Sequence, residues 1–325
     1  MGLTGKTILV TGGAGFIGSW VIDKIALHKP KKIVVVDSFF LGRMENLDEV
    51  KSRIGDGLKI HNCDATRHEA LENILMKEGQ VEAVFNLAVK PLFVSFVDPV
   101  SVFSTSVRIA TNLLELQRNG LFKTLIHFSS SEAYGSALYV PMDEKHPLKP
   151  TTPYGAGKAA ADHLVISYFM SYGNDAAIIR PFNNFGPRQN DQMYAGVIPT
   201  TIKKILTGEP PIILGDGNQT RDFTYVEDTA EAAVKIYETK ETRGRIMNIG
   251  RGEETSINEL VHMIAEIMGY EGEVVYDKAR PADVRRHLAD ITLAKKLIDL
   301  KPKFSLRQGL RKTVAWYVDK LSGQR

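Results

Sequence analysis

The 325-residue chain has a single cysteine, Cys63. One cysteine excludes an intrachain disulfide and a cysteine-rich metal site, and we predict no metal centre. Such sparse cysteine is typical of a reducing compartment. The chain also lacks any run of about 18 apolar residues, which excludes a transmembrane helix. The N-terminus has no charged segment followed by an apolar run, the mark of a secretory signal, so we expect a cytoplasmic protein without a membrane partner.

Charge of one sign is not in excess. Lys and Arg total 41 and Asp and Glu total 38, which gives a net charge of +3. This balance argues against a nucleic-acid-binding protein, which usually has a basic face. Apolar residues make up 43% and charged residues 24%, a composition that excludes a disordered chain. The length allows a large core and about two domains.

Short apolar runs alternate with helical patterns through the first half of the chain. Runs that are apolar throughout indicate strands buried on both faces, as in a parallel sheet with helices on each side. This pattern predicts an α/β fold with a doubly wound parallel sheet. The predicted strands are Thr7–Thr11, Lys32–Asp37, Leu58–Asn62, Ala83–Leu87, Thr124–Ser129 and Ala176–Arg180, with one more at Gly244–Ile249.

The sequence changes in texture after about Pro181, where glycine and proline become frequent. We expect a smaller, interleaved α/β domain that binds substrate. The larger domain would comprise residues 1–181 plus about 226–252, and the smaller one about 182–225 plus 253–325. Helical patterns in this half cover Val197–Leu206, Val226–Glu238, Ile257–Met268 and Leu306–Leu321.

Residues 11–18 read Thr-Gly-Gly-Ala-Gly-Phe-Ile-Gly and lie between a predicted strand and a predicted helix. Glycine permits a positive φ and lets the backbone approach a diphosphate, and the helix N-terminus offers free N–H groups. The spacing of Gly12, Gly15 and Gly18 is G-x-x-G-x-x-G, which differs from the G-x-G-x-x-G of most dinucleotide dehydrogenases. A structural tight turn is the alternative interpretation.

Asp37 ends the next strand, 19 residues after Gly18. A carboxylate at this distance accepts hydrogen bonds from the adenosine ribose hydroxyls, so the segment predicts a Rossmann-type dinucleotide site. The same carboxylate would repel a 2′-phosphate, although Arg43 is near enough in sequence to hold one. We therefore expect NAD rather than NADP.

Tyr154 and Lys158 share one face at the start of a predicted helix. A free tyrosine has a pKa near 10, and a neighbouring ammonium is expected to lower the pKa of Tyr154. The phenolate could then remove a proton from a sugar or alcohol hydroxyl while hydride passes to a nicotinamide. Because this spacing is also common on helix surfaces, the interpretation depends on its surroundings.

Those surroundings are the end of the fifth predicted strand, which continues into Ser129, Ser130, Ser131 and Glu132. Ligands of open α/β sheets bind beyond the carboxyl ends of the strands. One of these serines could share a hydrogen bond with Tyr154 and the reacting oxygen. The alternative is a polar loop that only caps a helix.

Together these motifs resemble the extended short-chain dehydrogenase/reductase family, in its branch of nucleotide-sugar epimerases and dehydratases. The resemblance covers nearly the whole chain. Its motifs are TGGAGFIG at 11–18, Asn86-Leu-Ala88, SSSEAYG at 129–135, YxxxK at 154–158, RPFNNFGPRQ at 180–189, GDGNQTRDFTYVEDTAEA at 215–232 and RPADVRRHLADIT at 280–292.

The resemblance implies a role for each matching residue. Tyr154 would be the base, Lys158 its partner and a nicotinamide-ribose ligand, and Ser130 a ligand of the sugar O4. Asn183 would bind the diphosphate of the nucleotide sugar. The implied cofactor contacts are Gly12, Gly15, Phe16, Ile17, Gly18, Asp37, Asp64, Ala65, Leu87, Ala88 and Lys158. The other candidate substrate contacts are Lys90, Ser131, Arg188, Arg221 and Arg280, the last two for the nucleotide and its phosphates.

Two positions depart from the family pattern. The segment after the fourth strand has one residue fewer than usual and contains Lys90, which could reach the nicotinamide or the sugar, or face solvent. Gly157 replaces the more common serine before Lys158.

The resemblance leaves the reaction open. Family members oxidise the sugar at C4; an epimerase then returns the hydride to the other face, whereas a dehydratase removes the C5 proton and expels the C6 hydroxyl. Glu132 could be the base for that elimination. We favour a 4-epimerase, with a 4,6-dehydratase and a non-catalytic NAD-sensing protein as alternatives.

The resemblance also implies a homodimer in which two helices of each copy form a four-helix bundle. These are the predicted helices at about 99–119 and 153–172. Their apolar residues exceed what one sheet face needs and include Val102, Leu113, Leu116, Leu164, Val165 and Phe169.

Overall fold

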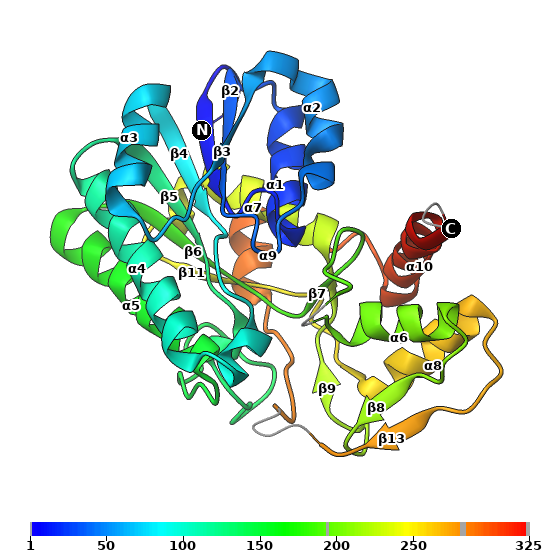
Figure 1. The fold of residues 1–325 in the computed structure, drawn as a ribbon. Helices are drawn as coiled ribbons and strands as arrows, with labels where there is room; N and C mark the ends of the chain where they lie inside the picture. The colour runs from blue at the N-terminus through cyan, green and yellow to red at the C-terminus, as the bar shows by residue number, and fades with distance from the viewer. Residues whose placement is uncertain (1, 193–194, 280–283, 323–325) are drawn as a thin grey trace.

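The computed structural model describes residues 2–192, 195–279 and 284–322. Within them, the largest feature is a parallel sheet of seven strands in the order β11-β6-β5-β4-β1-β2-β3 (Figure 1). The strands are β1 (Thr7–Thr11), β2 (Lys32–Asp37), β3 (Leu58–Asn62), β4 (Val81–Asn86), β5 (Phe122–Phe128), β6 (Asp175–Pro181) and β11 (Ile246–Ile249). The strand order reverses beside β1, which confirms the predicted doubly wound α/β fold.

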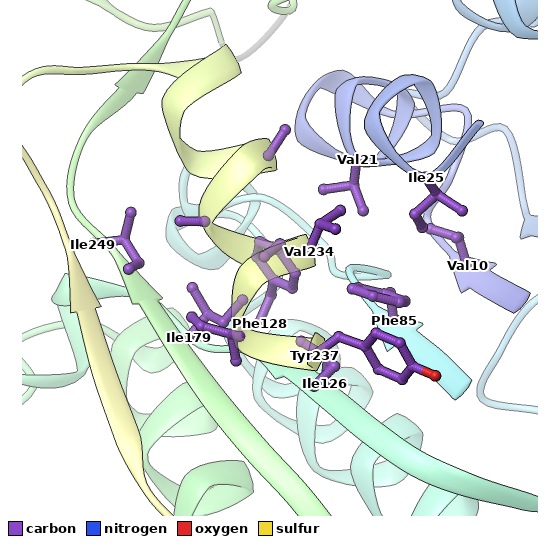
Figure 2. Packing of buried hydrophobic residues seen from close by; sticks show 14 of the residues in the cluster. Val10, Val21, Ile25, Phe85, Ile126, Phe128, Ile179, Val234, Tyr237 and Ile249 are labelled. Atoms are coloured by element: carbon purple, nitrogen blue, oxygen red, sulfur yellow. The ribbon is translucent and has the colours of Figure 1, made fainter. Parts of the chain in front are cut away.

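Helices cover both faces of this sheet because its strands send alternate side chains to opposite sides. Val10 of β1 faces a core formed with α1 and α7, as Figure 2 shows, whereas Leu9 faces α3, α4 and α5. The helices of the first face are α1 (Phe16–Leu27), α2 (Asp48–Ile54), α7 (Val226–Glu238) and α9 (Thr292–Ile298). Those of the second are α3 (His68–Glu78), α4 (Pro99–Arg118) and α5 (Pro153–Tyr172).

A smaller unit has a core of its own, which includes Phe185, Ile202 and Leu260. Its strands pair in twos, as β7–β10, β9–β12 and β8–β13. The helices are α6 (Val197–Leu206), α8 (Ile257–Met268) and α10 (Leu306–Ser322). The strands are β7 (Asn184–Phe185), β8 (Ile212–Leu214), β9 (Thr220–Arg221), β10 (Thr224–Tyr225), β12 (Thr255–Ser256) and β13 (Val275–Asp277).

One segment differs from the predicted division of the chain. Residues 289–300, which we expected in the smaller domain, pack on the main sheet: Ile291, Ala294 and Ile298 belong to the core beneath α7. Their apolar side chains are buried against β11 and α7 rather than against α8. The remaining boundaries stay a prediction.

Short 3₁₀ helices complete the fold: η1 (Met44–Leu47), η2 (Gly55–Gly57), η3 (Leu92–Phe96), η4 (Ser131–Ala133) and η5 (Lys240–Thr242). In the described parts of the chain, no helix is both long and apolar enough to cross a bilayer. Within the same ranges, no three His, Cys, Asp or Glu side chains are grouped as a metal site.

Candidate active site

The glycine loop joins β1 to α1 and lies against the end of β4. Gly12 has a φ of 68°, and a Cβ at this position would come within 2.7 Å of the backbone nitrogen of Ala88. The backbone nitrogen of Gly15 donates to the carbonyl oxygen of Gly12 over 3.1 Å, and Gly18 packs against the same carbonyl. Larger residues would displace the loop, so these glycines keep its backbone close to the strand ends, where a diphosphate can approach.

Asp37 lies at the end of β2 with its carboxylate fixed by backbone N–H groups. Ala14 donates to it over 2.9 Å and Phe39 over 2.8 Å. Burial raises the pKa of Asp37, while these hydrogen bonds act in the opposite direction. Arg43, the residue that could have held a 2′-phosphate, instead lies 3.2 Å from Glu45 and 3.5 Å from Asp191 in ion pairs. The arrangement fits the ribose hydroxyls of NAD better than the phosphate of NADP.

A cavity of about 990 Å³ extends along the carboxyl ends of the strands and into the smaller unit. Its wall includes every residue that the sequence suggested for the cofactor. These are Gly12, Gly15, Phe16, Ile17, Gly18, Asp37, Asp64, Ala65, Leu87, Ala88 and Lys158. The glycine cradle, the fixed carboxylate and the volume of the cavity fit a dinucleotide; the role of each single residue stays a prediction.

Tyr154 is positioned by the first turn of α5. Thr152 caps this helix by accepting a hydrogen bond from the backbone nitrogen of Gly155 over 3.1 Å. Burial raises the pKa of Tyr154 to about 12; a hydrogen bond with Ser130 lowers the pKa, and the negative charge of Glu132 raises it. The phenol therefore shares a hydrogen bond with a cavity serine.

Lys158 does not lower the pKa of Tyr154 as the sequence predicted. Its ammonium lies 6.0 Å from the centre of the Tyr154 ring and donates to the carbonyl oxygen of Phe128 over 2.7 Å. Burial lowers the pKa of Lys158 to about 8, and the charge of Asp162 raises it. The expectation was wrong for the protein alone, because the pKa of Tyr154 is raised and burial of the phenol is the largest cause.

The serine segment after β5 brings several polar groups to the cavity. The backbone nitrogen of Glu132 donates to Ser130 Oγ over 3.2 Å, which starts η4. Ser131 Oγ lies 3.5 Å from Nδ1 of buried His287. Ser130, Ser131 and Glu132 all line the cavity with Tyr154. With Lys158, which also lines the cavity, the structure brings together the four predicted catalytic side chains, Ser130, Glu132, Tyr154 and Lys158.

Lys90 also lines the cavity, half-buried, with its ammonium bonded to Ser101 Oγ near the start of α4. The second departure, Gly157, lies where α4 approaches α5. A Cβ at Gly157 would come within 3.1 Å of both the Cα and the carbonyl oxygen of Phe103. Glycine here lets the two helices pack closely beside the cavity.

Asn183 and Arg221 line the far end of the cavity. Among the described residues, no group accepts a hydrogen bond from the buried amide nitrogen of Asn183. A buried donor without an acceptor is costly, so its position in a cavity wall points to an acceptor on a ligand. Arg280, the other candidate for this end, lies outside the described residues.

Arg188 is not in the cavity wall. Its guanidinium pairs with Asp23 at 2.5 Å and Glu49 at 3.2 Å, and lies 5.0 Å from the ring centre of Trp20. These partners belong to α1 and α2, so Arg188 fastens the segment after β7 to the larger unit. Sequence position alone could not reveal this, because the acidic partners are more than 130 residues away.

Other polar residues of the wall were missed. Gln189, Lys204, Gln219 and Asp277 contribute from the smaller unit, whose irregular sequence gives no periodic signal of orientation. Asp222, a buried residue outside the wall, was missed as well. Its carboxylate is buried and accepts hydrogen bonds from the backbone of Arg251 and Gly252, at 2.8 and 2.9 Å. These hydrogen bonds hold residues 251–252 against the segment that follows Arg221.

Comparisons with known proteins agree with this geometry. Residues 9–313 match the family model of GDP-mannose 4,6 dehydratase. A Methanocaldococcus jannaschii protein, named provisionally as a UDP-glucose 4-epimerase, is 37% identical over 95% of this chain and 97% of its own length. The UDP-glucuronic acid decarboxylase 3 of Arabidopsis thaliana is 33% identical over 93% of this chain and 86% of its own.

Solved structures are similarly close. UDP-glucose 4-epimerase of Thermotoga maritima, solved with UDP-glucose, superposes with a TM-score of 0.90 at 33% identity, covering 97% of this chain and 99% of that one. A dTDP-glucose 4,6-dehydratase of Streptomyces venezuelae, solved with NAD, gives 0.91 at 27% identity, covering 98% of each chain. The chain belongs to the extended short-chain dehydrogenase/reductase family, in its branch of nucleotide-sugar epimerases and dehydratases.

Proposed function

We propose that the chain is an NAD-dependent nucleotide-sugar 4-epimerase. The observation that carries the proposal is the single cavity whose wall includes the glycine loop, Asp37, Tyr154 and Asn183. A dinucleotide and a nucleotide sugar would meet beside Tyr154. Similarity to a UDP-glucose 4-epimerase over nearly the full length supports this choice.

Each residue of the cavity wall has a separate role in the proposed reaction. Tyr154 removes the proton of the sugar O4, and Ser130, already bonded to the phenol, holds that oxygen. Lys158 supplies positive charge beneath the phenol, and Asn183 donates to the substrate diphosphate. The glycine loop and Asp37 would hold NAD, which would supply a reversible acceptor for the hydride of C4. Tyr154 gives the proton back once the sugar has turned, so the chain ends each cycle unchanged.

A 4,6-dehydratase is the second candidate, and Glu132 is the reason to keep it. Its carboxylate lines the cavity close enough to Tyr154 to raise the pKa of the phenol. A base near the sugar could remove the C5 proton of a 4-keto intermediate. The named relatives include both dehydratases and epimerases, and they include decarboxylases that act on a glucuronic acid sugar.

The proposal is tested by incubating purified protein with UDP-, dTDP-, GDP- and CDP-sugars in D₂O and following products by NMR. An epimerase gives the C4 epimer without deuterium. Deuterium at C5 with loss of the C6 hydroxyl identifies a dehydratase. The protein should also purify with NAD(H) partly bound, because each cycle returns the hydride. A protein that binds NAD but changes no sugar would be the non-catalytic sensor.

A further inference from the structure

A chain of buried polar side chains crosses the sheet directly beneath the cavity. Thr11, Asn86 and His127 stand opposite one another in neighbouring strands, since Thr11 pairs with Asn86 and Asn86 with His127. Thr11 Oγ1 donates to Asn86 Oδ1 over 2.7 Å, and Asn86 Nδ2 lies 3.0 Å from His127 Nδ1. All three residues are at most 3% exposed.

The direction of the hydrogen bonds in this chain follows from the orientation of the Asn86 amide, whose Nδ2 lies toward His127. The backbone nitrogen of Ala88 donates to Thr11 Oγ1, which leaves the hydroxyl hydrogen for Asn86 Oδ1. The amide nitrogen of Asn86 can only donate, so His127 Nδ1 must accept. Burial lowers the pKa of His127 to about 3, so the ring is neutral at pH 7. Its proton therefore resides on Nε2.

That Nε2–H group faces the carboxylate of Asp162 on α5, the helix that also carries Tyr154 and Lys158. His127 Nε2 lies 3.8 Å from Asp162 Oδ1, and among the described residues neither atom has a hydrogen-bond partner. The other oxygen of Asp162 accepts from Ser129 Oγ at 2.7 Å and from Arg180 at 2.8 and 2.9 Å. His127 is thus the group that faces the free oxygen of Asp162.

Asp162 lies one turn after Lys158 on α5, so the two side chains share a face. Lys158 itself donates to the carbonyl oxygen of Phe128, the residue after His127. The ionisable groups around Lys158 are Asp162, whose charge raises its pKa, Tyr154 on the same helix, and His127 on β5. Arg180 on β6 faces Asp162 from the remaining side.

We propose that His127 is a positioning residue for Lys158: its Nε2–H faces Asp162 Oδ1 across 3.8 Å and supports the negative charge of that carboxylate, which in turn supports the ammonium of Lys158. This inference rests on the proposed function only in giving Lys158 a catalytic role. A neutral histidine suits the task, because a buried imidazolium beside Lys158 would repel the ammonium that it is meant to support.

Two substitutions of His127 test the role of Nδ1 separately from the role of Nε2. In His127→Asn the side-chain amide can replace Nδ1 as the acceptor for Asn86 but cannot reach Asp162. In His127→Gln the longer amide can replace the Nε2–H donor. Leu125→Val, two residues earlier on β5 and facing the same core, is the control for a general disturbance of packing.

The titration of Lys158 is followed by NMR of protein labelled with [ε-¹³C]lysine, with the signal assigned from Lys158→Arg. We expect His127→Asn to lower the titration midpoint of Lys158 by about one pH unit, a tenfold change in proton affinity. His127→Gln and Leu125→Val should stay close to wild type. With substrate, the alkaline limb of kcat should shift by the same amount in His127→Asn.

An unchanged midpoint in folded His127→Asn would overturn the inference, as would equal shifts in the Asn and Gln variants. If His127→Asn does not fold, the test falls to His127→Gln. A titration midpoint of Lys158 that is lowered by about one pH unit in His127→Gln would then overturn the inference. Because the NMR readout needs no turnover, it separates the two hypotheses. A midpoint that responds to His127 in a protein inactive on every nucleotide sugar would refute the proposed function and retain the inference.

Discussion

Tyr154 and Glu132 face the same cavity but would do different work, and substitution of each tells the two reactions apart. In an epimerase, Tyr154→Phe should lower kcat by about 10²–10⁴, because the general base is lost. Glu132→Gln should cost far less, since Glu132 would only position the substrate. Stopped-flow NADH absorbance and product analysis would check both variants.

If the protein is a dehydratase, we expect different kinetics for Glu132→Gln. Glu132→Gln would then leave the first oxidation intact, so NADH absorbance would rise and persist while a 4-keto hexose accumulates. Equal, severe losses in both variants without any NADH signal would contradict both reactions, because Glu132 would then act in the hydride step or in the fold.

Buried histidines should make the protein sensitive to mild acid. Burial lowers the pKa of His287 to about 3, whereas an unfolded histidine titrates near 6.5. The unfolded state therefore binds more protons between these pH values, and the free energy of unfolding falls as pH decreases from 6.5. From pH 7 to pH 5 the loss is about 2 kcal/mol for this one residue.

Urea unfolding of His287→Gln at both pH values measures this loss. The variant should lose about 2 kcal/mol less than wild type between pH 7 and pH 5, since its amide does not titrate. Its carboxamide can still donate to the carbonyl oxygen of Gly135, as the ring now does over 2.8 Å. Identical pH dependence in the two proteins would show that His287 titrates with the same pKa in the folded state as in the unfolded state.

At the scale of elements, α4 and α5 approach each other closely at Gly157. We expect Gly157→Ser to force these helices apart, because the new Cβ would come within 3.1 Å of Phe103 backbone atoms. Overpacking of this kind costs about 1–3 kcal/mol in the free energy of unfolding. As α4 also carries Ser101, the partner of Lys90, KM for the nucleotide sugar should rise more than kcat falls.

Ala160→Ser, one turn later on α5 and only half-buried, is the matched control for Gly157→Ser. Urea unfolding and steady-state kinetics of both variants separate crowding from a general effect of serine in the helix. If Gly157→Ser left the free energy of unfolding and KM unchanged, the prediction would be wrong, because α4 could then move to accept the serine without affecting substrate binding.

The sheet could be predicted from sequence because most of its strands contain an apolar run; β1, β2 and β3 have the predicted bounds. The glycine loop and the catalytic segments were predictable because their chemistry is local. The contacts of His127, Asp162 and Asp222 could not be predicted from sequence. Each depends on strand register or on hydrogen bonds between residues far apart in the chain. The pKa of Tyr154 was also mispredicted, because burial cannot be read from a helical spacing.

At the scale of the whole molecule, we still predict a homodimer, but not through four of the six residues that suggested it, since of these six only Leu164 and Phe169 are half-buried. Val102, Leu113, Leu116 and Val165 are fully buried within the chain, where all but Val102 pack with the core beneath α4 and α5. The apolar side chains left exposed on these helices include Val100, Phe103, Met170 and Tyr172.

Light scattering at micromolar concentration tests the dimer. Wild type should have twice the mass of one chain, and Val100→Asp should shift the equilibrium toward monomer, because a charge is costly to bury at an interface. Phe40→Asp, an exposed apolar residue far from both helices in sequence, is the control. A monomeric wild type would refute the prediction.

The central claim is that hydride leaves C4 of the sugar and returns to C4. The most direct measurement supplies a nucleotide sugar deuterated at C4, chosen from the panel as a substrate, and locates the label in the product by NMR. We predict that the C4 epimer keeps its deuterium at C4. Deuterium found at C6 of a 6-deoxy-4-keto product, or lost to solvent, would contradict the claim.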